Sequence, residues 1–343
     1  MKHHLNTLFI TTADAWLSKD GAAVKVRIEK QTRLRVPFNN IGSIVCLGRV
    51  GCSTPLMAAC AQHGISLAFL TEYGRFQVAI QGYTPGNVLL RRIQYRRSDD
   101  DAASAAIATA CVIGKIANCR SVLRRAARES NQPQTADQLS NAATKLDDVL
   151  QRLTQNHPLD VVRGLEGEGG AIYFSVFSQL ITSGETAFQF TTRSRRPPLD
   201  PMNALLSFLY AMLAGDARAA CEAAGLDAAV GFLHRDRPGR PGLALDIMEE
   251  LRPMLADRLA LSLVNRRQVK PDGFRREETG AVLMDDATRK TVLAAYQKRK
   301  QEELVHPFLQ EKVSLGLVVH LQARLLARHL RGDLDAYPPC VWK

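Results

Sequence analysis

Hydrophobic and polar positions follow two different periods along this 343-residue chain. Between residues 6 and 83, short β-branched or alternating runs are separated by turn residues, a pattern typical of strands. The exception is Thr54–Gln62, which predicts a helix. The predicted strands are TLFITT, AAVKVRIEK, TRLRVPF, IGSIVCLG, ISLAFL and FQVAIQGY.

The pattern becomes helical from about Asn87, after the turn sequence YTPG at Tyr83–Gly86. We therefore expect an α+β protein with a small N-terminal β domain (residues 1–86) and a larger all-α domain (residues 87–343). Arg- and Pro-rich loops are expected at Thr191–Pro201 and His234–Gly242. The predicted helical stretches are 101–131, 136–155, 159–182, 202–225, 244–265, 284–303 and 308–332.

Composition narrows the class of protein. With 46% hydrophobic and 23% charged residues the chain is expected to fold, and 45 basic against 34 acidic residues favour a polyanionic partner such as nucleic acid. We found no long apolar run and no signal peptide, so we expect a cytoplasmic protein without a membrane partner. Seven cysteines without a CxxC pair are expected to be reduced packing residues.

The segment RGLEGEGG at residues 163–170 interrupts an apolar helical stretch with four glycines. Each glycine costs a helix about 1 kcal/mol, which suggests that another helix, a metal site or a DNA backbone approaches closely. A simple helix crossing with two surface glutamates explains the segment equally well.

Two further segments carry candidate chemistry. Gly231–His234 delivers a histidine to the start of an Arg/Pro loop, although a lone histidine is more often structural. In LALDIMEELRP (243–253), Asp246 shares a helical face with Glu249 or Glu250, a cluster that is usually only a solvated face. Two carboxylates and an imidazole would suit Mg²⁺ or Mn²⁺, and nearby arginines would suit phosphoryl transfer.

Four ordered motifs resemble the integrases of CRISPR adaptation, the family of the first-numbered Cas proteins. They are GLEG with its following aromatic helix (164–174), DPMNALLSFLYAML (200–213), GFLH (231–234) and LALDIMEELRP (243–253). The opening LNTLFITTADAWLSKDG and the closing YPPCVWK are similar to subtype C of the type I systems.

The resemblance implies that Glu166, His234 and Glu249 are catalytic residues and ligands of Mg²⁺ or Mn²⁺. Asp246 matches a supporting aspartate. The register leaves Glu250 as an alternative to Glu249, and Glu168 is the less favoured neighbour of Glu166.

The resemblance also implies the activity and the partners. Family members are homodimers that assemble on a small adaptor, the second-numbered Cas protein, and insert short fragments into the CRISPR array. The 3′-hydroxyl of the fragment attacks a phosphodiester. Double-stranded and branched DNA are therefore expected partners, and a trimming nuclease is a further one.

Arginines in the two loops are the best candidates for DNA contacts, whereas for Arg91, Arg92, Arg96 and Arg97 a solvated helix face is at least as good an explanation. Asn203 is expected to cap its helix or fix the neighbouring loop, close to Tyr210, and Arg252 to pair with a ligand carboxylate. The loop arginines are Arg193, Arg195, Arg196, Arg235, Arg237 and Arg240.

Two rival functions remain open on the sequence alone. A catalytically silent scaffold would use only the basic surface to bind DNA. A nuclease for branched repair intermediates would share the chemistry and lack a CRISPR partner.

Overall fold

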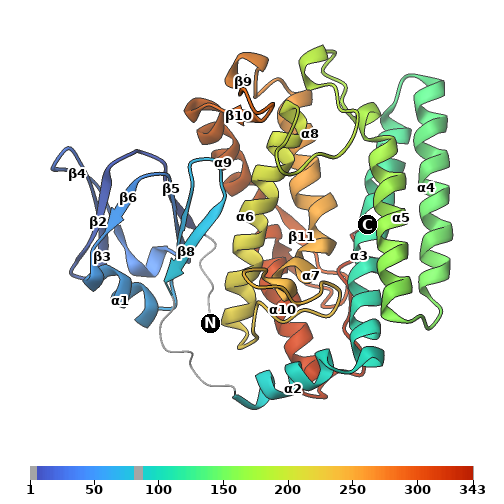
Figure 1. The fold of residues 1–343 in the computed structure, drawn as a ribbon, viewed down its shortest axis with the longest axis horizontal. Helices are drawn as coiled ribbons and strands as arrows, with labels where there is room; N and C mark the ends of the chain where they lie inside the picture. Colours follow the sequence, from blue (N-terminus) through green and yellow to red (C-terminus); the bar gives the residue numbers. More distant parts are fainter. Residues whose placement is uncertain (1–5, 81–87, 343) are drawn as a thin grey trace.

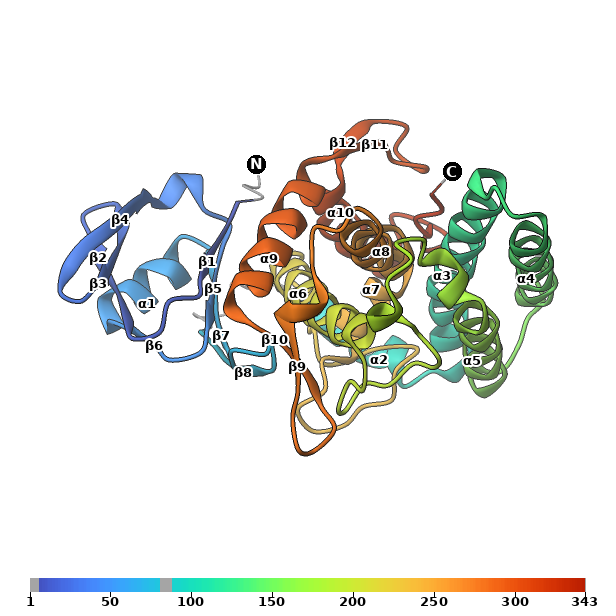
Figure 2. The ribbon, with the colours of Figure 1, turned by 90° about the horizontal axis from the view of Figure 1, so that it is seen from above.

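The computed structural model describes residues 6–80 and 88–342, which form a small β-rich part beside a larger helical part (Figure 1). Seen from above, the β-rich part lies at one end of the molecule and α4 at the other (Figure 2). The α+β fold predicted from the sequence is confirmed. The predicted domain boundary at residues 86 and 87 lies outside the described residues.

The β-rich part contains two four-stranded sheets. One has the order β1-β5-β7-β8, with only the β7–β8 pair antiparallel, and the other has the order β4-β3-β2-β6, with only the β2–β6 pair parallel. The strands are β1 (Thr7–Ile10), β2 (Ala15–Asp20), β3 (Ala23–Ile28), β4 (Gln31–Pro37), β5 (Ser43–Leu47), β6 (Val50–Cys52), β7 (Ser66–Leu70) and β8 (Phe76–Ile80).

Most of the predicted strands and the predicted helix are confirmed. Helix α1 spans Thr54–Gln62 and packs against β2 and β7. The prediction missed β2 and β6, because AWLSKD has three apolar residues followed by three polar ones and VGC has only three residues. In β6, Gly51 lets the Trp16 ring of β2 lie against the backbone, where a Cβ would come within 2.3 Å of the ring.

The helical part is built around α3, which packs against α4, α5 and α7, while α6 packs against α7 and α10. Aspartates cap several helices, as at Asp100, whose side chain accepts hydrogen bonds from Ala102 N and Ala103 N. The helices are α2 (Val88–Ser98), α3 (Asp101–Glu129), α4 (Pro133–Leu153), α5 (Leu159–Ser175), α6 (Pro201–Ala223), α7 (Gly242–Leu251), α8 (Arg258–Asn265), α9 (Asp286–Gln301) and α10 (Leu315–Leu330).

The structure corrects several predicted helix limits. Helix α5 ends at Ser175, and the stretch 244–265 is divided by a π-helical turn at Arg252–Asp257, where Pro253 interrupts the α-helical bonding pattern. The second domain is also not purely α-helical. It contains two short hairpins, β9 (Phe274–Arg276) with β10 (Val282–Met284), and β11 (Glu303–Val305) with β12 (Lys312–Ser314).

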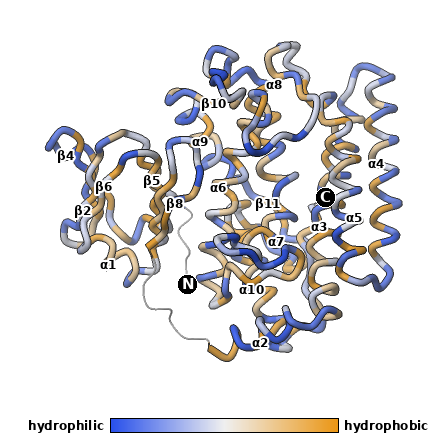
Figure 3. The backbone as a smooth tube through the Cα atoms, viewed as in Figure 1, coloured by the Kyte–Doolittle hydropathy of each residue, from blue (hydrophilic) through white to orange (hydrophobic). Residues whose placement is uncertain are grey.

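Two hydrophobic clusters hold the fold. The smaller lies within residues 10–67, and the larger fills the helical part and also takes in Leu47 and Leu70 of the first sheet. Along β5, Ile44 and Cys46 join the smaller cluster, whereas Val45 and Leu47 face the helices, as the two-residue period of a strand requires. One sheet therefore serves both cores. Hydrophobic stretches follow these interior faces in Figure 3.

Contrary to our expectation from the sequence, α3 and α6 are each long and apolar enough to span a membrane, by length and composition alone. In their most apolar windows, 67% and 56% of the residues are buried inside the protein. Both are core helices of the larger cluster. All seven cysteines are free thiols and six are buried, as predicted.

Candidate metal centre and nucleic-acid cleft

Three segments that are distant in sequence bring Glu166, His234 and Glu249 together. Glu166 lies on α5, His234 lies in the loop between α6 and α7, and Glu249 lies on α7. His234 Nε2 lies 3.8 Å from Glu249 Oε1. Lys115 of α3 contacts Glu166 Oε1, and its Nζ lies 2.8 Å from Glu249 Oε2. The three predicted site residues thus converge around a lysine that the sequence analysis missed.

Asp246 fixes the direction of the histidine. Its Oδ2 accepts hydrogen bonds from Phe232 N (2.6 Å) and Leu233 N (3.0 Å), and its Oδ1 accepts from His234 N (3.0 Å). The same Oδ1 lies 2.7 Å from His234 Nδ1. Because Asp246 is fully buried, this pairing favours a proton on Nδ1 and leaves Nε2 free as a ligand atom. Asp246 therefore orients the His234 imidazole.

The electrostatics of the site keep Glu249 ionised. Burial alone would raise the pKa of Glu249, but Arg252, Lys115 and His234 lower it to about 2. Burial would likewise lower the pKa of Lys115, yet Glu249 and Glu166 outweigh burial and raise it. The group is a pair of carboxylates, Glu249 buried and Glu166 partly exposed, that cations neutralise.

The structure decides between the two adjacent glutamates. Glu250 points away from His234 and accepts hydrogen bonds from Tyr337 Oη (2.5 Å) and Cys340 N (2.6 Å). Glu168 also faces away from the site, toward an exposed ion pair with Arg152. Glu249 and Glu166 are therefore the members of each pair that share the site.

The residue types in this site suit a hard divalent cation. Two carboxylates and an imidazole nitrogen held by a second carboxylate are typical ligands of Mg²⁺ or Mn²⁺. Buried Glu249 Oε2 accepts no hydrogen bond of good geometry from the described residues. In the described arrangement no three such side chains form a ligand group at once, because the Lys115 ammonium lies between the two carboxylates. Binding of an ion there requires this ammonium to move aside.

Arg252 contacts a candidate ligand, and Asn203 contacts the neighbouring loop. Arg252 Nη1 lies 2.8 Å from Glu249 Oε1, and its guanidinium lies over the Tyr210 ring at 4.9 Å. Asn203 fixes the neighbouring loop, since its Oδ1 accepts from Arg193 Nη1 (2.7 Å) and its Nδ2 donates to Thr192 O (2.8 Å). The helix itself is capped by Asp200.

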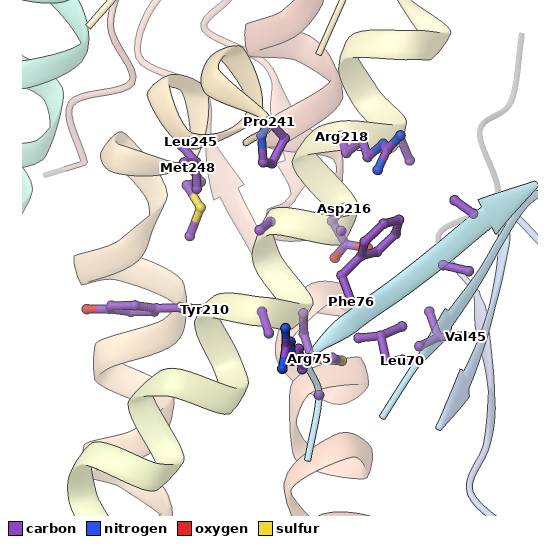
Figure 4. Close-up of a pocket in the computed structure, with 18 of the residues that line it drawn as sticks. Val45, Leu70, Arg75, Phe76, Tyr210, Asp216, Arg218, Pro241, Leu245 and Met248 are labelled. Atoms are coloured by element: carbon purple, nitrogen blue, oxygen red, sulfur yellow. The ribbon is translucent and has the colours of Figure 1, made fainter. Parts of the chain in front are cut away.

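A cleft of about 2230 Å³ between the two parts of the molecule contains this site. Its walls include β7 and β8 on one side and α6 and α7 on the other. In Figure 4, Phe76 lies beside Asp216 and Arg218 of α6, whereas the Tyr210 ring points away from the strands. Glu166, His234 and Glu249 line the cleft. So do all six loop arginines predicted to contact DNA: Arg193, Arg195, Arg196, Arg235, Arg237 and Arg240.

These six arginines differ in their solvent exposure and in their partners within the protein. Arg195, Arg196 and Arg237 are exposed, whereas Arg235 Nη2 pairs with Asp160 Oδ1 at 2.9 Å. Arg193 hydrogen-bonds Asn203 and Ser207 and is partly buried, so its placement favours a structural contribution. In α2, Arg91 lines the cleft.

The four glycines of the first motif serve different purposes. At Gly169 a Cβ would come within 2.2 Å of Ile116 Cδ1, so this glycine permits the crossing of α5 with α3. At Gly164, Gly167 and Gly170 an added Cβ would meet nothing within 4 Å. The helix-crossing explanation thus accounts for one glycine of the four.

Sequence reasoning missed two residues that organise the site. Lys115 is the only charged residue between Ala102 and Cys119, and a lone lysine in an apolar helix signals a buried charge with a partner. Arg163, directly before GLEG, donates from Nε to Leu233 O at 2.7 Å and so ties α5 to the histidine loop. No local pattern predicted that contact.

Comparison with known proteins decides the family. The family model described as "CRISPR associated protein Cas1" matches residues 8–298. The chain belongs to the Cas1 family. A relative from Chlorobaculum tepidum, a "CRISPR-associated endonuclease Cas1 1", is 50% identical over 343 residues, which cover 100% of both chains. The resemblance drawn from the four motifs is therefore confirmed.

Two solved structures share the fold of this Cas1 family member. A chain of a "Cas6-RT-Cas1--Cas2 complex" has a TM-score of 0.82 at 23% identity, over 100% of this chain and 36% of that chain. A "Casposase bound to integration product" has a TM-score of 0.82 at 20% identity, over 98% of this chain and 93% of that one.

Proposed function

We propose that this protein is a metal-dependent DNA integrase and endonuclease of CRISPR adaptation. One observation carries the proposal: Glu166, His234 and Glu249 meet in a cleft that six arginines also line. Membership of the Cas1 family supports it, as does the name endonuclease given to the Chlorobaculum tepidum relative. The intact carboxylate–histidine group favours an enzyme over a silent scaffold.

The proposed reaction is a transesterification. The 3′-hydroxyl oxygen of an incoming fragment forms a bond to a repeat-boundary phosphorus while the bond from that phosphorus to the leaving 3′-oxygen breaks, and the hydroxyl proton passes to solvent as the leaving oxygen gains one. Bonds of one kind are exchanged, so no co-reactant is needed. Water in place of the hydroxyl gives hydrolysis.

The residues divide this work among them. Glu166, His234 and Glu249 would hold Mg²⁺ or Mn²⁺, which when bound polarises a phosphoryl oxygen and lowers the pKa of the attacking hydroxyl. Asp246 keeps His234 in its ligating tautomer. The loop arginines, Arg237 and Arg240 among them, neutralise and orient the DNA backbone.

The proposed partners follow from the proposed integrase function. We include double-stranded and branched DNA, a second copy of this chain, and the adaptor Cas2 in a larger integration complex. The related casposase structure contains an integration product, and the other structural relative is a complex with Cas2. A trimming nuclease is included to prepare fragment ends. The proposed location is the cytoplasm.

The deciding experiment is strand transfer on branched DNA by the purified protein with Mn²⁺, Mg²⁺ or EDTA. We expect metal-dependent joining by the wild type, loss of joining in Glu166→Ala, and wild-type joining in the matched control Glu168→Ala. DNA binding in EDTA should survive in all three. DNA that is bound but never cut or joined, with Cas2 present as well as absent, would establish the scaffold instead.

A further inference from the structure

The C-terminal segment Tyr337–Trp342 lies against α7 on the side that carries Glu250, next to the face that carries Glu249. It follows α10, and its end reaches α3 in Figure 1, where the C-terminus is marked beside that helix. Tyr337 and Cys340 are buried, although the two prolines between them keep the segment extended. The segment is thus part of the folded core.

The segment is hydrogen-bonded to α7 through the buried carboxylate of Glu250. Glu250 is fully buried, and its Oε1 accepts from Tyr337 Oη at 2.5 Å. Its Oε2 accepts from Cys340 N at 2.6 Å and from Gln322 Nε2 of α10 at 2.9 Å. Gly114 of α3 leaves room for this side chain, since a Cβ there would lie 2.7 Å from Glu250 Cγ.

Asn118 connects the backbone of Glu250 to the C-terminal segment. The buried Asn118 of α3 donates from Nδ2 to Glu250 O (2.7 Å) and to Cys340 O (2.8 Å). Its Oδ1 accepts from Trp342 N at 2.7 Å. Both the side chain and the carbonyl of Glu250 are therefore held by polar groups that involve the last residues of the chain.

The position of this network along α7 is informative. Glu250 follows Glu249, and neighbouring residues of a helix point about 100° apart, so fixing one side chain sets the direction of the other. Just beyond them α7 gives way to the π-helical turn Arg252–Asp257, where regular helical bonding no longer fixes the register. A buried acid is also a poor choice for stability alone, because apolar packing of similar volume is often at least as stable.

We propose that Tyr337–Trp342 is a positioning element for the metal ligand Glu249 and acts through Glu250. The inference rests on the proposed function, because it concerns the affinity of the Glu166–His234–Glu249 group for a divalent ion. The segment contacts neither the ion nor DNA. It holds the helix that presents the ligand.

The test compares two buried tyrosine hydroxyls in the full-length protein. Tyr337→Phe removes the donor to Glu250, whereas Tyr296→Phe removes an equivalent donor to Asp216 Oδ2 (2.8 Å), a pair that joins α9 to α6 at the cleft. Mn²⁺ binding by calorimetry and the thermal unfolding midpoint are measured for each. We expect Tyr337→Phe to weaken Mn²⁺ binding at least about threefold, in the direction known for residues that orient ligands. Tyr296→Phe should keep the Mn²⁺ affinity within about twofold of wild type, even if its thermal unfolding midpoint falls as far as that of Tyr337→Phe.

The outcomes separate this inference from the proposed function. Equal Mn²⁺ affinity in the two variants overturns the positioning role. A wild-type protein that binds no Mn²⁺ overturns the metal centre and the positioning role together. Should Tyr337→Phe not fold, Trp342→Ala decides, since it removes the packing of the indole against the larger core cluster and against Arg258 (4.5 Å) and so loosens the end of the segment. The same weakening is expected there, and an unchanged affinity contradicts the inference.

Discussion

Lys115 Nζ lies 2.8 Å from Glu249 Oε2 and also contacts Glu166, so one buried ammonium joins two of the three proposed metal ligands. Both side chains of the Lys115–Glu249 pair are almost fully buried. Each charge therefore depends on the other, because an uncompensated buried charge is costly. The lysine keeps the carboxylates together and competes with a divalent ion for them.

Lys115→Met should consequently tighten Mn²⁺ binding and weaken the metal-free fold. We expect an affinity about tenfold higher, which corresponds to about 1.4 kcal/mol, and a lower unfolding midpoint that Mn²⁺ restores. Calorimetry and thermal unfolding measure the two effects. Lys300→Met is the control, because it breaks a different buried pair, Lys300 with Asp216 (2.8 Å). Weaker Mn²⁺ binding in Lys115→Met would contradict the competition.

Asp246→Asn should weaken Mn²⁺ binding while preserving the shape of the site. An amide cannot accept from three backbone N–H groups and His234 Nδ1 as the carboxylate does, so the imidazole loses its fixed tautomer. Loss of such an orienting group typically costs about 10- to 100-fold in metal affinity. Calorimetric Mn²⁺ binding measures it, and an affinity equal to wild type would show that Asp246 only supports the loop.

Arg237→Ala and Arg240→Ala should each make DNA binding less dependent on salt. Each arginine that neutralises a phosphate contributes about one unit to the slope of log K against log salt, so each variant should reduce that slope by about one. Arg324→Ala on α10 is the control, since Arg324 is exposed and does not line the cleft. Binding titrations in EDTA at several salt concentrations measure the slopes. Equal slopes for all three variants would remove these two arginines from the DNA interface.

Glu250→Gln should flatten the pH dependence of stability. Burial raises the pKa of Glu250 from 4.5 to about 7, so its contribution is fully present below pH 4.5 and is lost as the pH rises through 7. The shift corresponds to about 3 kcal/mol across that interval. Urea unfolding between pH 5 and pH 8 should show the wild-type free energy of unfolding falling more steeply than that of the variant. Parallel curves would contradict this assignment.

Local pattern was sufficient for much of the fold and for the family. Thr54–Gln62 was predicted as a helix with the observed limits, and the long apolar stretches gave the core helices within a few residues. Strand β2 escaped prediction because its sequence AWLSKD does not alternate, and β6 because pairing within a sheet stabilises segments too short to show a period. The two hairpins after α8 and α9 escaped for the same reason.

The candidate site was likewise predictable in part from the sequence and in part only from the tertiary structure. The sequence by itself determined the types of the ligands and their motifs. The GLEG helix, the GFLH loop and the acidic helix are each short local sequences that can be identified without knowledge of the fold. The motif register favoured Glu249 but did not exclude Glu250, because the helical period places both near Asp246. Only the tertiary structure decided between them, by packing α10 and the C-terminal segment against Glu250 and turning Glu249 toward His234.

Lys115 and Arg163 show why the rest required the fold. Their partners, Glu249 and Leu233, lie 134 and 70 residues away, and contacts over such separations depend on how whole helices pack. Neither the distances between the site residues nor the charge balance of the site could be predicted from the sequence, because both arise where α3, α5 and α7 pack together. The chemistry of the residues thus determined what this protein can bind. The packing of the helices determined where the candidate ligands lie and which cation balances their charge.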